Sequence, residues 1–113
     1  MQKLPKSDLH SHAGRGGTLA YIGQGAGVTI QPPAAPFDSL GEMNQWLNTH
    51  VKCHSPGISG YVKRVEAAFA QAAADHIQVL ALSYGIDEID SLGGMDIFLH
   101  YMELLHHTFA PDT

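Results

Sequence analysis

The chain has 113 residues, of which 44% are hydrophobic and 15% charged, a composition typical of one folded domain with its own core. Six basic residues against eleven acidic ones give a net charge of −5, which argues against binding to nucleic acid or to an acidic membrane surface. No apolar run approaches the ~20 residues of a membrane span, and the charged N-terminus lacks the apolar segment of a secretory signal. The single cysteine, Cys53, excludes an internal disulfide and is typical of a protein from the reducing cytoplasm.

The first expected element is a short strand over residues 7–13, and a long loop follows it. The stretch from Gly14 to Pro36 is rich in glycine and proline and has no apolar periodicity. Loops of this length in compact domains are commonly functional, so we expect a mobile flap next to an active site.

Two helices are expected in the middle of the chain. Ser39 and Glu42 have the spacing of a capping box, and apolar residues at helical spacing continue from there to Val51. A stop at residues 55–57, Ser-Pro-Gly, separates this helix from a second one that begins near Ser59 or Gly60. The second helix has an apolar stripe, formed by Val62, Val65, Phe69, Ala72 and Ala73. Polar residues are expected to lie off that stripe: Lys63, Arg64, Glu66 and Gln71.

Residues 77–84 form the clearest strand of the sequence. They are almost continuously apolar, which is typical of a parallel strand that is buried on both faces. A turn-rich stretch over residues 87–94 leads to a third helix over 95–107. Alternating strands and helices predict a parallel α/β fold in which residues 7–13 and 77–85 pair through a right-handed helical crossover. Two parallel strands need cover on both faces and both edges, so we expect a single but incomplete domain over residues 1–113.

His10 and His12 are the leading candidates for chemistry among the eight histidines of the chain. Residues i and i+2 of a strand point to the same side, so both imidazoles project together while Ser11 points away. Two imidazoles placed in this way can bind one metal ion at ~2.0–2.1 Å from each nitrogen. An H-x-H pair alone is weak evidence, because chance pairs and exposed histidines are common.

The surroundings of this pair resemble the first barrel strand of the adenosine deaminase family. The segment Pro5-Lys6-Ser7-Asp8-Leu9-His10-Ser11-His12 carries the specific part of the resemblance. The remaining layout is similar too, with a long excursion, an alanine-rich helix over residues 62–69 and a buried strand over 77–84.

The resemblance implies a fold, a metal and a reaction. It implies the N-terminal part of an amidohydrolase-type (β/α)₈ TIM barrel in which His10 and His12 bind zinc, or another divalent metal such as iron or manganese. The remaining ligands of such a family, a histidine and an aspartate, and its proton-transfer groups lie on later strands that the 113 residues do not contain. The implied reaction is attack of metal-activated water on a purine, with release of ammonia. We therefore assign no catalytic residue within this chain.

One departure from the family pattern concerns the substrate. Adenosine-specific members carry x-Asp-Gly after the second histidine, whereas this chain has Ala13-Gly14-Arg15. We take Gly14 and Arg15 as candidate substrate-binding residues. The missing acid and the added arginine leave open a different purine, or a phosphorylated or otherwise anionic substrate.

Three other groups of polar residues are alternatives to the histidine pair. His50, Cys53 and His54 share one side of a helix end with zinc-type ligands, but histidines there often complement the helix dipole and a lone cysteine is often an apolar filler. A second group, on the third helix, consists of His100, Glu103 and His107, for which a solvated stripe is the simpler interpretation. The third is the acidic run 87–90, which would lie at the active end of a barrel but is typical of a solvated turn.

Two hypotheses therefore remain open. In the first, the chain is the N-terminal fragment or subunit of a metal-dependent purine deaminase, inactive alone and completed by a C-terminal partner chain or by copies of itself. In the second, it is a small stand-alone α/β protein that binds a metal or self-associates without catalysis. In either case, the expected partners include neither nucleic acid nor membrane.

Overall fold

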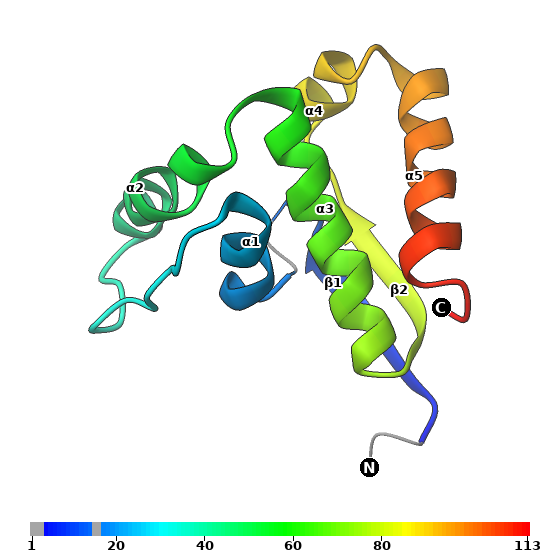
Figure 1. Ribbon diagram of the computed structural model, residues 1–113, viewed down its shortest axis with the longest axis horizontal. Coiled ribbons are helices and arrows are strands. Elements are labelled where there is room, and N and C mark those ends of the chain that lie inside the picture. Colours follow the sequence, from blue (N-terminus) through cyan, green and yellow to red (C-terminus); the bar gives the residue numbers. More distant parts are fainter. Residues whose placement is uncertain (1–3, 15–16) are drawn as a thin grey trace.

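The protein is described by a computed structural model that covers residues 4–14 and 17–113 (Figure 1). These residues form two strands and six helical segments. In chain order they are β1 (Lys6–His12), α1 (Leu19–Ala26), α2 (Leu40–His50), the 3₁₀ turn η1 (Lys52–His54), α3 (Gly57–Ala74), β2 (Ile77–Ser83), α4 (Ile86–Ser91) and α5 (Met95–Phe109). Within the described residues, no helix combines the length and the apolar character needed to cross a membrane.

The two strands form a parallel pair, as the sequence predicts. Lys6 is opposite Ile77 at one end of the pairing and His12 is opposite Ser83 at the other. The ladder extends one residue further, because the Ala13 amide donates a hydrogen bond to the Ser83 carbonyl at 3.0 Å. Both strands therefore reach their carboxyl ends side by side, and the chain is a mixed α/β fold. The (β/α)₈ barrel, of which this pair would be the beginning, remains a prediction.

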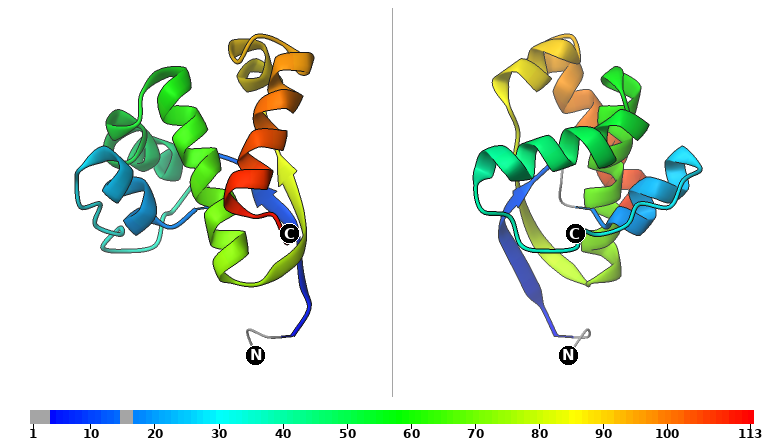
Figure 2. Two further views of the ribbon diagram at one scale, coloured as in Figure 1. Left: turned by 45° about the vertical axis from the view of Figure 1, so that its right-hand side comes forward. Right: turned by 90° about the vertical axis from the view of Figure 1, so that its left-hand side faces the viewer.

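One face of the sheet is covered by α3 and α5, which lie on the same side of the strands (Figure 2). On this face, Leu80 and Leu82 of β2 pack against the main core. That core consists of Ala13, Tyr61, Val65, Phe69, Leu92, Phe98, Leu105 and Ala110. Because burial of apolar surface is the main stabilising contribution to folding, this face holds the two strands in place.

The opposite face of the sheet carries no described element. Leu9 is 70% exposed and Val79 is 57% exposed, although both belong to the strands. The sequence predicted that residues 77–84 are buried on both faces, and this is wrong for the described residues. A near-continuous apolar strand is typical of a sheet that is covered on both faces. Among the described residues, only the face under the helices is covered.

A smaller apolar cluster holds the N-terminal excursion against α3. Its buried members are Ile22, Ile30, Val51 and Ala67. Trp46 and Leu47 of α2 pack against it, so α1 and α2 form a side layer next to α3 (Figure 1).

Two helices lie where the sequence predicted loop or turn. Residues 14–36 contain α1, which Thr18 caps by accepting a hydrogen bond from the Tyr21 amide at 3.2 Å. Gly27 ends α1 in the left-handed conformation with φ 74°, the usual role of a C-terminal glycine. The predicted turn over 87–94 contains the short helix α4. Glycines within α1 and after both segments lower helix propensity, so the sequence pattern did not predict either helix.

The three predicted helices are confirmed, with differences at their ends. Ser39 accepts a hydrogen bond from the Glu42 amide at 3.1 Å, as a capping box requires. The Glu42 carboxylate, however, accepts from the Asp38 amide at 2.9 Å instead of from Ser39. α3 begins at Gly57, slightly before the predicted start, and α5 continues to Phe109.

Candidate functional site

His10 and His12 lie on the exposed face of β1, away from the helices. Both side chains are exposed, whereas Ser11 is partly buried and Ala13 is fully buried on the helical side. The two imidazole rings are 5.4 Å apart between centroids and tilted by 45°. The structure thus brings together the two residues that were predicted from the sequence as metal ligands. The Asp8 side chain accepts a hydrogen bond from the His10 amide at 3.2 Å.

A hollow of about 380 Å³ opens where the two strands end. Its wall combines strand ends with residues from the helices: His12, Gly14, Asn44, Lys52, Arg64, Ser83, Tyr84, Gly85 and Glu88. In parallel α/β folds, ligands bind at the carboxyl ends of the strands, so the hollow has the position expected of a binding site. His12 belongs both to the wall of this hollow and to the histidine pair.

Arg64 is the most unusual residue of this wall, because its side chain is only 8% exposed. Its Nη1 donates to the Ser55 carbonyl at 2.8 Å and to the Ser55 hydroxyl at 3.0 Å. Gly60 permits this contact, since any Cβ at that position would collide with the Ser55 carbonyl. The guanidinium carbon also lies 5.5 Å from the centre of the Tyr61 ring, within cation–π range.

The Nε–H of Arg64 has no hydrogen-bond partner among the described residues, although the atom is buried. Burial of the guanidinium lowers the pKa of Arg64, and the nearby charge of Glu88 acts in the opposite direction. An arginine remains charged in proteins, so the hollow contains a buried cation with an unused donor.

Glu88 and Gly85 line the hollow, and Tyr61 holds Glu88 from behind the wall. The Tyr61 hydroxyl and the Gly85 amide each donate to Glu88 Oε2 at 2.8 Å. Burial, followed by the hydrogen bond to Glu88, raises the pKa of Tyr61 well above its usual value. Burial also raises the pKa of Tyr84 to about 12, with a smaller contribution from the charge of Glu88. Both tyrosines therefore act as neutral donors at physiological pH.

Of the two predicted substrate-binding residues, the structure describes one. Gly14 lies in the wall of the hollow, where an added Cβ would be 3.2 Å from the Tyr61 ring and 3.9 Å from Arg64 Nε. Arg15 falls outside the described residues. Of the acidic run 87–90, Glu88 belongs to the hollow, whereas Asp87 and Asp90 are exposed elsewhere.

Neither rival group of ligands forms a metal cluster. Within residues 4–14 and 17–113, no three histidine, cysteine, aspartate or glutamate side chains gather closely enough to hold an ion. His50 stacks on Trp46 with ring centres 5.1 Å apart, and the Cys53 thiol donates to the Thr49 carbonyl at 2.8 Å. Cys53 is exposed, so its interpretation as an apolar filler is wrong.

Sequence reasoning missed the residues that shape the hollow. Arg64 was expected off the apolar stripe of its helix, and Asn44 and Lys52 had no motif to distinguish them. The burial of Arg64 follows from the approach of Ser55 across Gly60, a tertiary contact that helical periodicity does not contain. Glycine at position 60 was the one local sign of a close approach.

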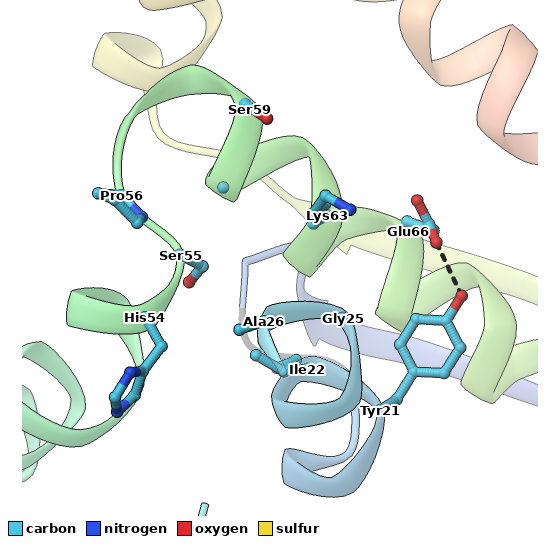
Figure 3. Close-up of a pocket in the computed structure, with 11 residues that line it drawn as sticks. Tyr21, Ile22, Gly25, Ala26, His54, Ser55, Pro56, Ser59, Lys63 and Glu66 are labelled. Carbon is cyan, nitrogen blue, oxygen red and sulfur yellow. Dashed lines mark hydrogen bonds between the residues drawn. The ribbon is translucent and has the colours of Figure 1, made fainter. Parts of the chain in front are cut away.

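A second hollow, of about 220 Å³, lies between α1, η1 and α3 (Figure 3). Tyr21 and Glu66 face each other across part of it, joined by a 2.8 Å hydrogen bond from the Tyr21 hydroxyl. Burial, followed by this hydrogen bond, raises the pKa of Tyr21. The hollow includes neither strand ends nor the histidine pair, so we place the candidate site at the first hollow.

Comparison of the chain with protein-family models, curated proteins and solved structures gave no match.

Proposed function

We propose that this chain supplies the first two βα units, and the first two metal ligands, of a metal-dependent hydrolase that deaminates a purine. The observation that carries the proposal is the placement of His10 and His12 on the face of the sheet opposite the helices. In a (β/α)₈ barrel, that face is the barrel interior, and active sites lie at the carboxyl ends of the strands.

The donor set fits part of a zinc site. Two imidazoles that share a tetrahedral zinc have ring centres roughly 5 Å apart, and His10 and His12 are separated by 5.4 Å. A structural or catalytic zinc takes at least three protein ligands, so other residues have to complete the site. Iron or manganese would be held by the same pair. When bound, the ion would supply the activation of water for attack on carbon.

The residues of the hollow would bind and orient the substrate beside the metal. Glu88 is fixed by two donors, Tyr84 remains protonated, and Asn44 and Ser83 add neutral polar groups. The exposed side chains Leu9 and Val79 argue that further structure covers the sheet and encloses this region. Either a C-terminal partner chain or additional copies of this chain would provide that cover.

Zinc affinity of the purified chain tests the metal assignment. We expect weak binding by the wild type, since two ligands and no third converge in the described part of the chain, and loss of most of that binding in a His10→Ala/His12→Ala variant. The matched control is His100→Ala/His107→Ala, which removes two exposed histidines from α5. Isothermal titration calorimetry of the three proteins gives the comparison.

Equal zinc binding by the wild type and the His10/His12 variant would reject the metal site. Ammonia release from a panel of purines tests the second part of the proposal. We expect no turnover by the chain alone, because the described residues place neither a third ligand nor a proton-transfer group beside the histidine pair. Rapid turnover by the purified chain would contradict its role as a part of a larger site.

A second candidate function, self-association without catalysis, is favoured by the exposed apolar residues of α5. Ile97, Leu99 and Leu104 are each about half exposed on this helix. Such a surface is typical of an interface between proteins. Two results together would favour this function. The wild type would bind no metal, and the His10→Ala/His12→Ala variant would still associate.

A further inference from the structure

We propose that two copies of this chain form a dimer through the free edge of β2 and an apolar stripe on α5. The stripe consists of Ile97, Tyr101 and Leu104, all of them exposed. The proposal rests on the second candidate function, self-association, and names the surface that carries it. It requires neither the histidine pair nor a metal.

The first observation is that the outer edge of β2 has no strand beside it. Among the described residues, β2 pairs with β1 alone, so its other edge presents backbone N–H and C=O groups to no strand. The seven residues of β2, Ile77–Ser83, include no charged residue, no proline and no glycine. Its one extra residue, Gln78, lies at the start of the strand. Soluble proteins usually protect such an edge with charges, prolines or bulges, so this edge indicates a place for another strand.

The edge of β1 differs, because it carries the protection that β2 lacks. Lys6 and Asp8 place charges on this strand, and the pairing register shifts between Asp8 and Ser11. The Asp8 side chain accepts the His10 amide at 3.2 Å, so this amide is satisfied within its own strand. A further strand is therefore expected at β2 and not at β1, and growth of the sheet stops when two copies have paired.

The second observation is the position of the stripe on α5. At about 100° per residue, the three residues of the stripe fall on one flank of the buried seam that Phe98 and Leu105 form. His106 falls on the other flank, where its ring stacks on Phe69 of α3 with ring centres 6.4 Å apart. The stripe therefore faces away from α3.

The stripe and the edge of β2 bound the same side of the molecule. Figure 1 shows α5 beyond β2, on the side away from β1. The seven residues of β2 are roughly 23 Å long and the fifteen residues of α5 roughly 22 Å, so both extend over a similar length. A stable interface buries about 800 Å² per partner, which is more than one strand edge supplies, so the helix has to contribute.

A second copy of this chain matches this side by symmetry. About a two-fold axis perpendicular to the sheet, β2 meets β2 in antiparallel orientation and the stripe meets the same stripe. Neither surface carries a charge, so each complements itself although the chain has a net charge of −5. A different partner would have to reproduce both an open strand and an apolar helix at the same spacing.

The dimer has a four-stranded sheet with the helices of both copies on one face. Leu9 and Val79 of both copies line the other face, which remains available for the cover proposed above. Because the central strands are antiparallel, the carboxyl ends of the two β1 strands lie at opposite ends of the sheet. The two histidine pairs are therefore separate, and the dimer alone does not complete a metal site.

Amide hydrogen exchange tests the strand pairing. In the monomer, the outward amides of β2 are open to water, whereas pairing with a second copy gives them hydrogen-bond acceptors. With a chelator present, we expect protection to increase with protein concentration, and most strongly within Ile77–Ser83. Sedimentation velocity on the same samples gives the dissociation constant of the dimer.

Ile97→Lys/Leu104→Lys tests the stripe. Lysine favours helix, and it lowers the net negative charge, so weaker association cannot come from repulsion between acidic chains. The dissociation constant should rise roughly tenfold or more, because apolar contact is lost and like charges meet across the axis. The matched control, Met95→Lys/Leu99→Lys, makes the same change at two exposed residues on the other flank of α5 and should dimerise as the wild type does.

Three results would overturn the proposal. A wild type that stays monomeric at every concentration is the first. The second is association without added protection of Ile77–Ser83, which would leave self-association standing and move its surface. The third is equal weakening by the two lysine variants, because general charge alone would then matter.

Two further variants separate this interface from the other assignments. A dimer that is lost in Leu9→Thr/Val79→Thr but kept in Ile97→Lys/Leu104→Lys would place the interface on the open face and reject the edge. The His10→Ala/His12→Ala variant should dimerise as the wild type does, so failure of the zinc site does not affect this result.

Discussion

The two faces of the β1–β2 sheet differ in composition and in packing. The helical face meets a core that includes Ala13, Val65 and Phe69, all largely or fully buried. The open face carries His10 and His12 together with the exposed Leu9 and Val79. One face therefore maintains the fold, whereas the side chains of the other face are exposed.

The histidine pair owes its position to the covered face. The burial of Ser11 and Ala13 toward the helices directs the adjacent His10 and His12 to the other side. The pairing register shifts between Asp8 and Ser11, which leaves Leu9 exposed beside His10. Packing on one face thereby orders groups on the other, as functional sites on rigid elements require.

The largest expected effect compares one residue from each face. Phe69→Ala should lower the free energy of unfolding by about 3 kcal/mol or more, because it removes a buried aromatic ring from the core. Leu9→Ala should change it by no more than about 0.5 kcal/mol, since its side chain is mostly exposed. Equilibrium unfolding in urea measures both. Similar losses in the two variants would show that the open face is packed in solution.

Self-association provides the next comparison. Leu9→Thr/Val79→Thr keeps β-branched or small side chains in the strands but removes apolar surface from the open face. If that face is an interface, this variant should raise the dissociation constant by roughly tenfold or more. The control, Leu40→Thr/Ile86→Thr, removes two exposed apolar residues at helix ends. Sedimentation velocity should show weaker association in the first variant alone; weaker association in the control alone would place the interface elsewhere.

A smaller effect concerns the pH dependence of stability on the covered face. The Tyr84 hydroxyl donates to the Met102 sulfur at 2.9 Å, and burial raises the tyrosine pKa to about 12. The unfolded chain loses this proton near pH 10, so the stabilising contribution of Tyr84 is complete below pH 10. It is lost as the pH rises from 10 through 12. Tyr84→Phe should therefore flatten the fall in stability over this range, measured by thermal unfolding; an unchanged slope would contradict the assigned shift.

Periodicity and capping in the sequence predicted most of the regular structure. The parallel strands and the helices after Ser39, near Ser59 and from Met95 are confirmed because each has a strong local pattern. The same patterns did not reveal α1, which contains glycines, or α4, which is short and flanked by glycines.

The candidate site was predictable in part. Strand alternation was enough to place His10 and His12 together. The buried Arg64 and the hollow around it arise from contacts between segments far apart in sequence, such as Arg64 with Ser55 and Tyr61 with Glu88. Local propensity contains no information on such contacts, so a charged residue off the apolar stripe was expected to be solvated.

The central claim is that the open face presents His10 and His12 as a pair of metal ligands. Nitrogen resonances of histidine imidazoles, recorded on ¹⁵N-labelled chain during a zinc titration, test it most directly. Two of the eight histidines, His10 and His12, should shift together and with one binding curve, while the other six remain in place. A shift confined to His50 and His54, or to His100 and His107, would contradict the claim.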